Sequence, residues 1–530
     1  MSVENAAAKN WRETMRAWLH PRVLTMLLFG FSAGLPILLI FSSLSLWLRE
    51  AGVDRSTVTY FSWAALAYSF KFVWAPLVDT LPLPLLTKRL GRRRAWLLTA
   101  QLAVIAAICL MAMINPAAGG QTLTMMAVAA VLLGLSSATQ DIVIDAYRIE
   151  CAEQELQALL SSAYIAGYRL GMLAAGAGAL YLAAWFGTSM EAYNYAAWQG
   201  SYLIMAAVML AGVITTLLIP EPAANRKKVY YPASYYLRFL LLFLCAAAVF
   251  ACVFFLSGGV VLALDGLFKG LFSSALGSEL APFSSLLAET GRLLFAACAA
   301  LAAAVLLIRA NLADSGMVSE TYISPVLDFF RRYGLQTSLL LLALIGLYRI
   351  SDILLGVVSN LFYQDIGFSK EVIASVTKTF GLFMTLLGGF VGGTLTVRYG
   401  VMRMLFLGAL LSSLTNLLFL LLAQAGANVP LLSLVIAADN LSAGLASAAF
   451  VAFLAGLTNI SFTAMQYALF SSLMTLLPKL LGGYSGTMAT AWGYERFFLA
   501  TALLGLPVLG LIWVAEKRLL LKIKETESLD

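Results

Sequence analysis

The sequence predicts an all-α membrane protein that crosses the bilayer many times, and three observations support this class. Of its 530 residues, 61% are hydrophobic and only 12% are charged, whereas a soluble domain carries about 25% charged residues. The run 23–48 contains no charged residue. Several later runs resemble it, and each is long enough to cross roughly 30 Å of hydrocarbon. A soluble enzyme is therefore excluded.

The apolar runs predict about fourteen transmembrane helices. In chain order they are 23–48, 57–78, 95–114, 123–146, 158–185, 200–219, 239–263, 291–309, 337–361, 371–397, 402–424, 431–456, 464–488 and 496–515. The first follows Arg12, Arg16 and Arg22, as a secretory signal would. It is too long for a signal and no small-residue cleavage site ends it, so we expect an uncleaved helix.

The charge distribution predicts the orientation. An even number of spans places both termini on one side, and most of the 34 Lys and Arg residues fall in segments on that side. The positive-inside rule makes it the cytoplasmic side. The net charge of +7 then reflects basic cytoplasmic loops. No nucleic-acid partner is predicted, and no obligate protein partner is evident.

The sequence contains few residues of the types that bind metal ions or form disulfides. The five cysteines lie in or beside apolar runs without CxxC spacing, and the only histidine is His20. We therefore predict no metal site, no disulfide framework and no cofactor.

Two six-helix blocks share landmarks in the same order, which indicates an internal repeat. Arg89-Leu90-Gly91 is matched by Arg398-Tyr399-Gly400, and Gly134 is matched by Gly444. Two halves of this kind describe the major facilitator architecture, in which a substrate binds near the midplane between them. The predicted domains are a cytoplasmic N-terminus 1–22, a bundle 23–219, a linker 220–336 with two extra helices at about 239–263 and 291–309, a bundle 337–516 and a cytoplasmic tail 517–530.

The basic loop from Lys88 to Arg94 follows Asp79 at the end of the second predicted helix. It resembles the loop after the second helix of the major facilitators, where Asp and Arg form cytoplasmic gate pairs and Gly permits a tight turn. A plain positive-inside loop is the alternative. The predicted gate comprises Asp79, Arg89, Gly91, Arg92, Arg93, Asp145, Arg148, Arg398 and Gly400.

Ionisable residues inside the predicted helices mark a transport pathway, because an unpaired charge in hydrocarbon is costly. Asp141, Asp145 and Arg148 share one helix face by their spacing. Desolvation favours protonation of the deeper carboxylate, so Asp141 is the first candidate for proton coupling. A purely structural gate network is the alternative for all three. Asp352 and Asp439 complete the predicted proton-coupling set.

The remaining polar residues of the helices predict the substrate. Embedded cations outnumber embedded acids, which suits an anionic or carboxylate-bearing solute. Aromatic and amide side chains suit sugar rings, although an interfacial belt and helix packing also explain aromatics. Arg349 and Asp352 could also neutralise each other as a structural pair. The predicted substrate-binding residues are Tyr60, Trp63, Lys71, Gln101, Gln140, Arg169, Arg349, Asn360, Lys378, Asn440 and Lys479.

Five segments together resemble the AmpG muropeptide permeases of Gram-negative bacteria. They are Gly30–Pro36, Tyr68–Asp79, Leu90–Arg94, Thr139–Arg148 and Ala464–Ser472. The fourth holds a Gln-Asp-Ile and Asp-Ala-Tyr-Arg string that is specific to this family and its acetyl-CoA transporter relatives. The two extra helices fit the fourteen-helix members.

The resemblance implies a proton-coupled importer of GlcNAc-1,6-anhydro-MurNAc and its peptides, working by alternating access from periplasm to cytoplasm in the bacterial inner membrane. It also implies roles in peptidoglycan recycling and β-lactamase induction. A permease for another anionic solute, such as acetyl-CoA or a sugar phosphate, is the main alternative. A polytopic membrane glycosyltransferase is a remote one, because no large catalytic domain and no HExxH or GxGD string is present.

Overall fold

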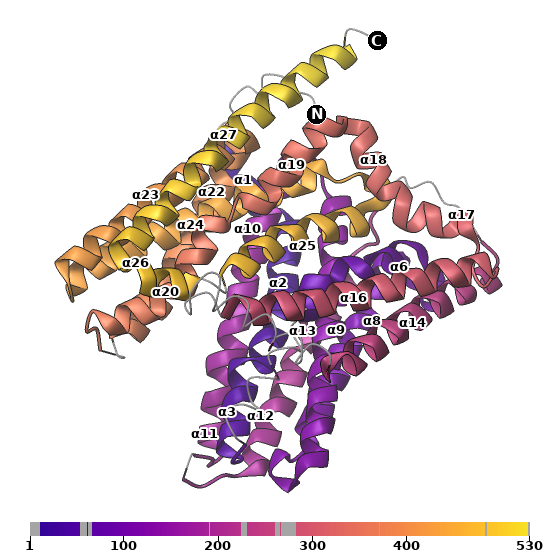
Figure 1. Ribbon diagram of the computed structural model, residues 1–530, viewed down its shortest axis with the longest axis horizontal. Coiled ribbons are helices and arrows are strands. Elements are labelled where there is room, and N and C mark those ends of the chain that lie inside the picture. Colours follow the sequence, from indigo (N-terminus) through magenta and orange to yellow (C-terminus); the bar gives the residue numbers. More distant parts are fainter. Residues whose placement is uncertain are drawn as a thin grey trace. The chain divides into compact units, whose positions relative to one another are not determined.

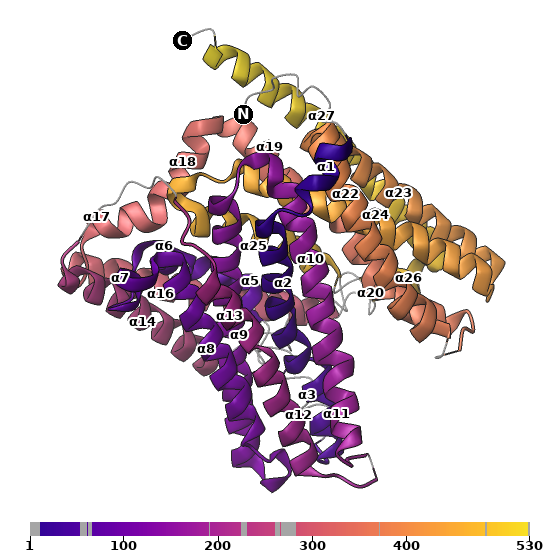
Figure 2. The same ribbon diagram turned by 180° about the vertical axis from the view of Figure 1, so that it is seen from behind.

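The computed structural model describes most of the chain as helix. The described residues are 11–53, 61, 66–189, 191–223, 231–259, 266, 282–369, 372–482 and 485–527, and all regular structure in them is helical (Figures 1 and 2). They form two compact units, one of Met1–Arg226 with Asp328–Asp530 and one of Lys227–Leu327. The first unit contains both six-helix halves.

The first half begins with a short helix and continues with membrane helices, several of them in pieces. In order they are α1 (Trp11–Ala17), α2 (Pro21–Ile40), α3 (Ser42–Glu50), α5 (Leu66–Phe70), η2 (Lys71–Val73), α6 (Ala75–Thr80), α7 (Leu86–Leu90), α8 (Arg92–Ala112), η3 (Pro116–Ala118), α9 (Gly120–Cys151), η4 (Gln154–Leu156), α10 (Gln157–Leu173), η5 (Ala174–Gly178), α11 (Ala179–Trp185), α12 (Tyr195–Val208) and α13 (Leu210–Leu218).

The second half repeats this plan. After α18 (Ser324–Tyr333) come α19 (Leu335–Leu347), α20 (Ile350–Asp365), η8 (Ile373–Phe380), α22 (Gly381–Tyr399), α23 (Val401–Ala425), α24 (Val429–Leu457), η9 (Ile460–Phe462), α25 (Thr463–Gly482), α26 (Ser485–Trp492) and α27 (Tyr494–Glu527). We call the end of the membrane helices at which α2 and α19 begin the proximal end, and the opposite end the distal end.

Within the described residues, twelve helices are long and apolar enough to cross a membrane, so the predicted class of polytopic all-α protein is confirmed. The predicted helices 57–78 and 464–488 are not among them. The first is partly outside the described residues, and its remainder forms three short pieces. The second is divided between α25 and α26. Proline contributes to the first division, because Pro76 lies in the first turn of α6 and cannot continue a preceding helix.

The first membrane helix of each half is interrupted, where the sequence predicted continuous runs. α2 and α3 are separated by Phe41, and α19 and α20 by Tyr348 and Arg349. Arg349 has a non-helical backbone, with φ −102° and ψ 11°. Membrane helices of this kind expose backbone groups only where protein or a water-filled cavity satisfies them.

Two glycines give the halves the same turn. Gly91 precedes α8 with φ 89° and ψ 171°, and Gly400 precedes α23 with φ 88° and ψ 156°. A side chain would be strained at this positive φ. The same backbone conformation at the same place in each half supports the internal repeat.

Glycines also bring α2 and α10 into backbone contact. A Cβ at Gly34 of α2 would lie 2.1 Å from the backbone oxygen of Tyr168, and one at Gly167 of α10 would lie 1.9 Å from that of Leu27. Small residues of this kind allow membrane helices to approach closely. The contact fixes α10, which also packs against α22 and α24 of the second half.

Replacing Gly167 by Ala is expected to destabilise the protein, because the added methyl group forces α2 and α10 apart. Overpacking of this kind costs about 1–3 kcal/mol, which thermal unfolding in detergent would detect. Gly178→Ala is the matched control in the same span, since a Cβ there meets nothing within 4 Å. An unchanged midpoint for Gly167→Ala would contradict the close approach.

The second unit, Lys227–Leu327, carries the two extra membrane helices, α14 (Ala233–Leu256) and α16 (Pro282–Arg309), followed by α17 (Ser315–Val318) and η7 (Ser319–Ile323). Arg292 of α16 donates from Nε to the backbone oxygen of Phe254 over 2.7 Å and lies over its ring. Few residues of either helix are buried, as expected of helices that face lipid.

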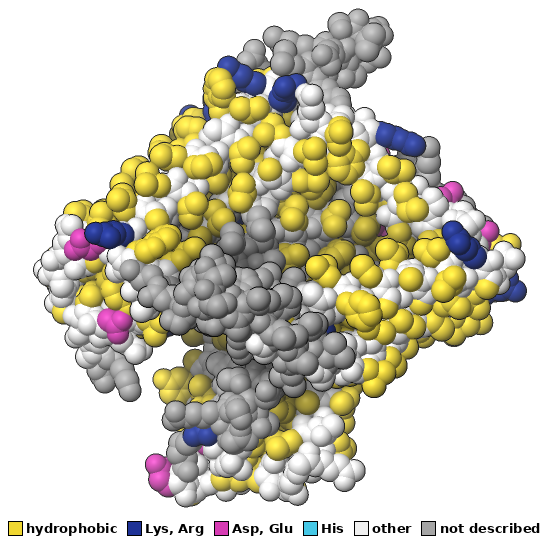
Figure 3. All heavy atoms as spheres, in the orientation of Figure 1, with side chains coloured by type: hydrophobic (Ala, Val, Ile, Leu, Met, Phe, Trp, Pro, Cys, Tyr) yellow, Lys and Arg dark blue, Asp and Glu magenta, His cyan; other side chains and the backbone are white. Residues whose placement is uncertain are grey.

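The surface agrees with a membrane environment. On the face shown in Figure 3, hydrophobic side chains predominate and few Lys, Arg, Asp and Glu side chains are visible.

Candidate functional site

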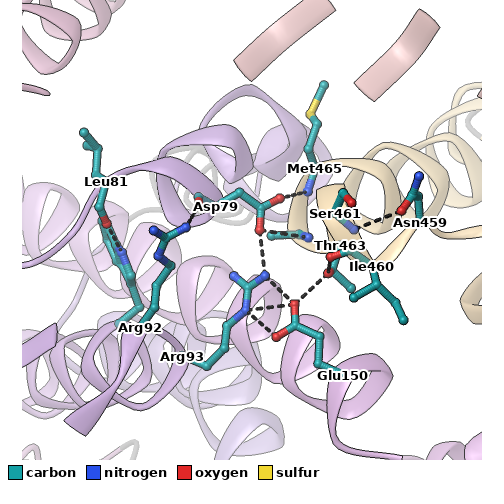
Figure 4. A network of polar contacts seen from close by, with 12 residues as sticks. Asp79, Leu81, Arg92, Arg93, Glu150, Asn459, Ile460, Ser461, Thr463 and Met465 are labelled. Atoms are coloured by element: carbon teal, nitrogen blue, oxygen red, sulfur yellow. Dashed lines mark hydrogen bonds and ion pairs between the residues drawn. The ribbon is translucent and has the colours of Figure 1, made fainter. Parts of the chain in front are cut away.

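A buried arginine at the proximal end binds two carboxylates. The guanidinium of Arg93, at the start of α8, is fully buried. Its Nη2 lies 2.6 Å from Asp79 Oδ1 and 2.6 Å from Glu150 Oε1, and its Nε also donates to Glu150 (Figure 4). Because a buried charge must be compensated, these three residues form one unit, which we call the Arg93 cluster.

The Arg93 cluster holds the first turn of α25, which belongs to the other half. Asp79 accepts hydrogen bonds from the backbone N–H of Ala464 over 3.3 Å and from that of Met465 over 2.9 Å. Thr463 donates its hydroxyl hydrogen to Glu150 over 2.6 Å. A helix N-terminus has unpaired N–H groups and a partial positive charge. The two carboxylates therefore join the halves at the proximal end (Figure 4).

Glu221 positions Arg93. Its carboxylate accepts hydrogen bonds from the backbone N–H of Arg93 over 2.8 Å and of Arg94 over 3.0 Å, and so caps α8. Gly91 allows this approach, since a Cβ there would lie 2.4 Å from the Glu221 side chain. The sequence analysis singled out Gly91 but missed Glu221, which lies in the predicted linker.

Among the described residues, the other predicted gate residues at this end form no ion pair with the Asp79 or Glu150 carboxylate. Arg92 donates to the backbone oxygen of Asp79. Arg89 is exposed and forms no hydrogen bond or ion pair with any residue that the structure describes. Arg398 stacks over the ring of Trp11, 4.4 Å from its centroid, so α1 contacts the second half (Figure 2). Trp18 adds a hydrogen bond of 3.1 Å to Thr394.

A second charged cluster lies deeper in the first half. Asp145 pairs with Lys71 over 3.3 Å and with Arg148 over 3.4 Å. Arg148 is fully buried and also lies over the ring of Tyr467 of α25, 5.1 Å from its centroid. We call Lys71, Asp145 and Arg148 the Asp145 cluster. Two cations compensate its carboxylate.

Asp141, one turn deeper than Asp145, has a different environment. It accepts a hydrogen bond of 3.2 Å from the hydroxyl of Tyr164 on α10. It is 8% exposed and forms no ion pair with the residues that the structure describes. Of the two carboxylates on this helix face, Asp141 alone lacks a bound cation within the described part of the chain.

The second half contains acids and a cation at its interrupted helix. Arg349 donates to the Ser447 hydroxyl over 2.9 Å and pairs with Asp352 over 3.7 Å. Asp352 also accepts a hydrogen bond from Ser412. Asp439 accepts one of 3.4 Å from Thr415. The arginine is thus shared between a carboxylate and a hydroxyl.

Arg169 of α10 is exposed and, among the described residues, has no hydrogen bond or ion pair. The like charge of Arg349 acts on its guanidinium unfavourably. One arginine comes from each half, so an anion placed between them would relieve this repulsion.

Of the other predicted binding residues, Lys378 donates to Asn360 over 3.1 Å, and both are exposed. Asn440 accepts from Thr385 over 2.8 Å. Gln101 and Gln140 are fully buried inside the first half, bonded to Thr216 and Ser32 respectively. Tyr60, Trp63 and the Lys479 side chain lie outside the described residues.

Comparisons with known proteins agree with this architecture. The family model of the Major Facilitator Superfamily matches residues 23–327. Putative transporter AmpG 4 of Rickettsia felis is 28% identical over 94% of this chain and 97% of its own length. Anhydromuropeptide permease of Escherichia coli K12 is 28% identical over 95% of this chain and 82% of its own length.

The fold also matches a solved structure. The proton:xylose symporter XylE bound to 6-bromo-6-deoxy-D-glucose has a TM-score of 0.55 at 13% sequence identity, over 94% of this chain and 96% of that chain. The family model covers more than half of the chain, and the curated relatives cover nearly all of it. The chain therefore belongs to the Major Facilitator Superfamily.

Proposed function

We propose that the protein imports anhydromuropeptides, GlcNAc-1,6-anhydro-MurNAc and its peptides, from periplasm to cytoplasm across the bacterial inner membrane, with both termini in the cytoplasm. The observation that carries this proposal is the 28% identity to the anhydromuropeptide permease over 95% of the chain. The relatives carry the names of transporters and permeases, which favours transport over an enzymatic reaction.

Transport proceeds by alternating access, in which the two halves expose the substrate site first to one side and then to the other. The proximal end is the cytoplasmic side in this proposal. The Arg93 cluster and the first turn of α25 are the closed cytoplasmic gate, supported by Arg398 and Trp11. The Asp145 cluster stiffens the first half behind the gate, where Arg148 contacts Tyr467.

The substrate carboxylates bind Arg169 and Arg349, which come from different halves. Arginine binds a carboxylate through two parallel hydrogen bonds. Exposed Lys378 and Asn360 offer further polar contacts in the second half. Because Arg169 has no partner among the described residues, an arriving anion need not displace an internal carboxylate from it.

Asp141 couples proton movement to transport. Its carboxylate is nearly buried and has a tyrosine hydroxyl as its hydrogen-bond donor. The alternatives are Asp352, which is paired with Arg349, and Asp439, which accepts from Thr415.

Uptake of labelled GlcNAc-1,6-anhydro-MurNAc into proteoliposomes tests the function. We expect accumulation when the outside is more acidic than the inside and none beyond equilibration without the gradient. Failure of folded protein to take up the label under either condition would contradict the proposal. Competition with unlabelled acetyl-CoA and sugar phosphates would then identify another anionic solute.

Replacing Arg93 by Ala is expected to open the cytoplasmic gate, because Asp79 and Glu150 then repel each other without a cation between them. Spin labels at Arg89→Cys and Arg403→Cys, in a protein without its five native cysteines, report the separation of the halves at this end. Both positions are exposed. We expect a longer distance to predominate. An unchanged distance distribution would contradict the gate assignment.

A further inference from the structure

A second polar network touches the same first turn of α25 from its own half. Asp328 of α18 accepts hydrogen bonds from Asn459 over 3.0 Å, from Gln466 over 2.9 Å and from Arg332 over 2.8 Å. Both carboxylate oxygens are therefore used. Asn459 and Gln466 flank the residues that bind the Arg93 cluster, and we call 459–466 the gate segment.

Gln466 is the centre of this network. It is 1% exposed, and its Oε1 accepts hydrogen bonds from the backbone N–H of Asn459 over 2.8 Å and from Arg332 over 3.0 Å. Arg332 also donates to the backbone oxygen of Leu457, over 3.1 Å, at the end of α24. The side chains of α18 thus join the end of α24 to the start of α25.

The two networks hold opposite ends of one short segment. Asp79 and Glu150 of the first half bind Thr463, Ala464 and Met465. Hydrogen bonds to carboxylates depend steeply on distance and direction. A small shift of the gate segment, by a fraction of the length of these hydrogen bonds, would therefore break its contact with the Arg93 cluster.

We propose that Asp328 and Arg332 are positioning residues of the gate: through Gln466 and Asn459 they hold the gate segment where the two carboxylates of the first half can bind it. Residues 227–327, which carry the extra helices, lead directly into α18. The inference rests on the proposed gate, not on the identity of the solute.

The spin-label pair Arg89→Cys and Arg403→Cys tests this without any substrate, so its outcome is independent of the uptake assay. Asp328→Ala is expected to lower the ratio of closed to open populations roughly fivefold, the effect of losing about one net hydrogen bond. Asp365→Ala is the matched control, since it removes the same charge from the same half at the distal end. We expect its distance distribution to equal that of the parent protein.

A double-mutant cycle separates positioning from local packing. If Asp328 acts through the gate segment, Asp328→Ala adds little once Arg93→Ala has already opened the gate, because residues of one network are not additive. Additive effects of Asp328→Ala and Arg93→Ala on the distance distribution would overturn the proposal. So would a distribution like that of the parent protein in both Asp328→Ala and Arg332→Ala, if Arg93→Ala changes the distribution. Thermal unfolding of each variant confirms that the measured molecules are folded. If the Asp328→Ala protein does not fold, Arg332→Ala takes its place in the cycle.

Discussion

Substituting Asn for Asp141 is expected to abolish proton-driven accumulation of the substrate and to leave the protein folded. Asparagine retains an oxygen that can accept the hydrogen bond from Tyr164, but it cannot bind and release a proton. One proton moving down a gradient of one pH unit supports about a tenfold accumulation. In Asp141→Asn we expect the internal and external concentrations to become equal at any gradient.

Two measurements make this result specific. Exchange of labelled for unlabelled substrate without a gradient should persist, because binding and alternating access remain. Asp145→Asn is the contrasting variant: it leaves Lys71 and Arg148 without a full counter-charge, so we expect a lower unfolding midpoint, as for a broken buried ion pair. Accumulation by Asp141→Asn at the parent level would move the coupling site to Asp352 or Asp439.

The contrast between these two aspartates shows where sequence reasoning reaches its limit. Helical spacing places Asp141 and Asp145 on one face, and the structure has both near the interior. Arg148 lies on the same helix face as Asp145 by its spacing, but the second cation that pairs with Asp145, Lys71, comes from another helix. A partner on another helix leaves no local pattern in the sequence. The sequence could therefore suggest that the two aspartates lie together, but not which of them is paired with cations and which is not.

The gate illustrates the same limit at a helix end. The sequence indicated Asp79 and Arg93 from a loop pattern, but it did not single out Glu150. Its contact with Thr463, more than three hundred residues away in the chain, depends on how the halves meet. The fold class and most spans followed from hydropathy because each span is a property of one stretch of chain, and the repeat followed from motifs that occur in both halves. The break at Arg349 did not, since that run contains no Pro and an isolated Gly, such as Gly346, is common in membrane helices.

Replacing Arg169 by Ala is expected to weaken substrate binding and at the same time to spare or raise the stability of the substrate-free protein. The effects on binding and on stability differ in sign because of the environment of Arg169. In the free protein Arg169 has no partner among the described residues and repels Arg349, so its removal relieves repulsion. In the complex it binds a carboxylate, and hydrogen bonds to charged groups contribute about 1.5–3 kcal/mol, or roughly a 10- to 100-fold change in affinity.

Binding of a labelled peptide-bearing anhydromuropeptide and thermal unfolding, each measured on the same preparations, test both signs. Arg89→Ala is the matched control, because it removes another exposed arginine without described partners, and neither quantity should change. Arg169→Lys keeps the charge but loses the planar pair of donors, so its affinity should fall between the two. Unchanged affinity in Arg169→Ala would exclude this arginine from the binding site. Reduced affinity together with reduced stability would indicate a structural role. A residue that serves only to bind the anion can be removed from the substrate-free protein without lowering its stability.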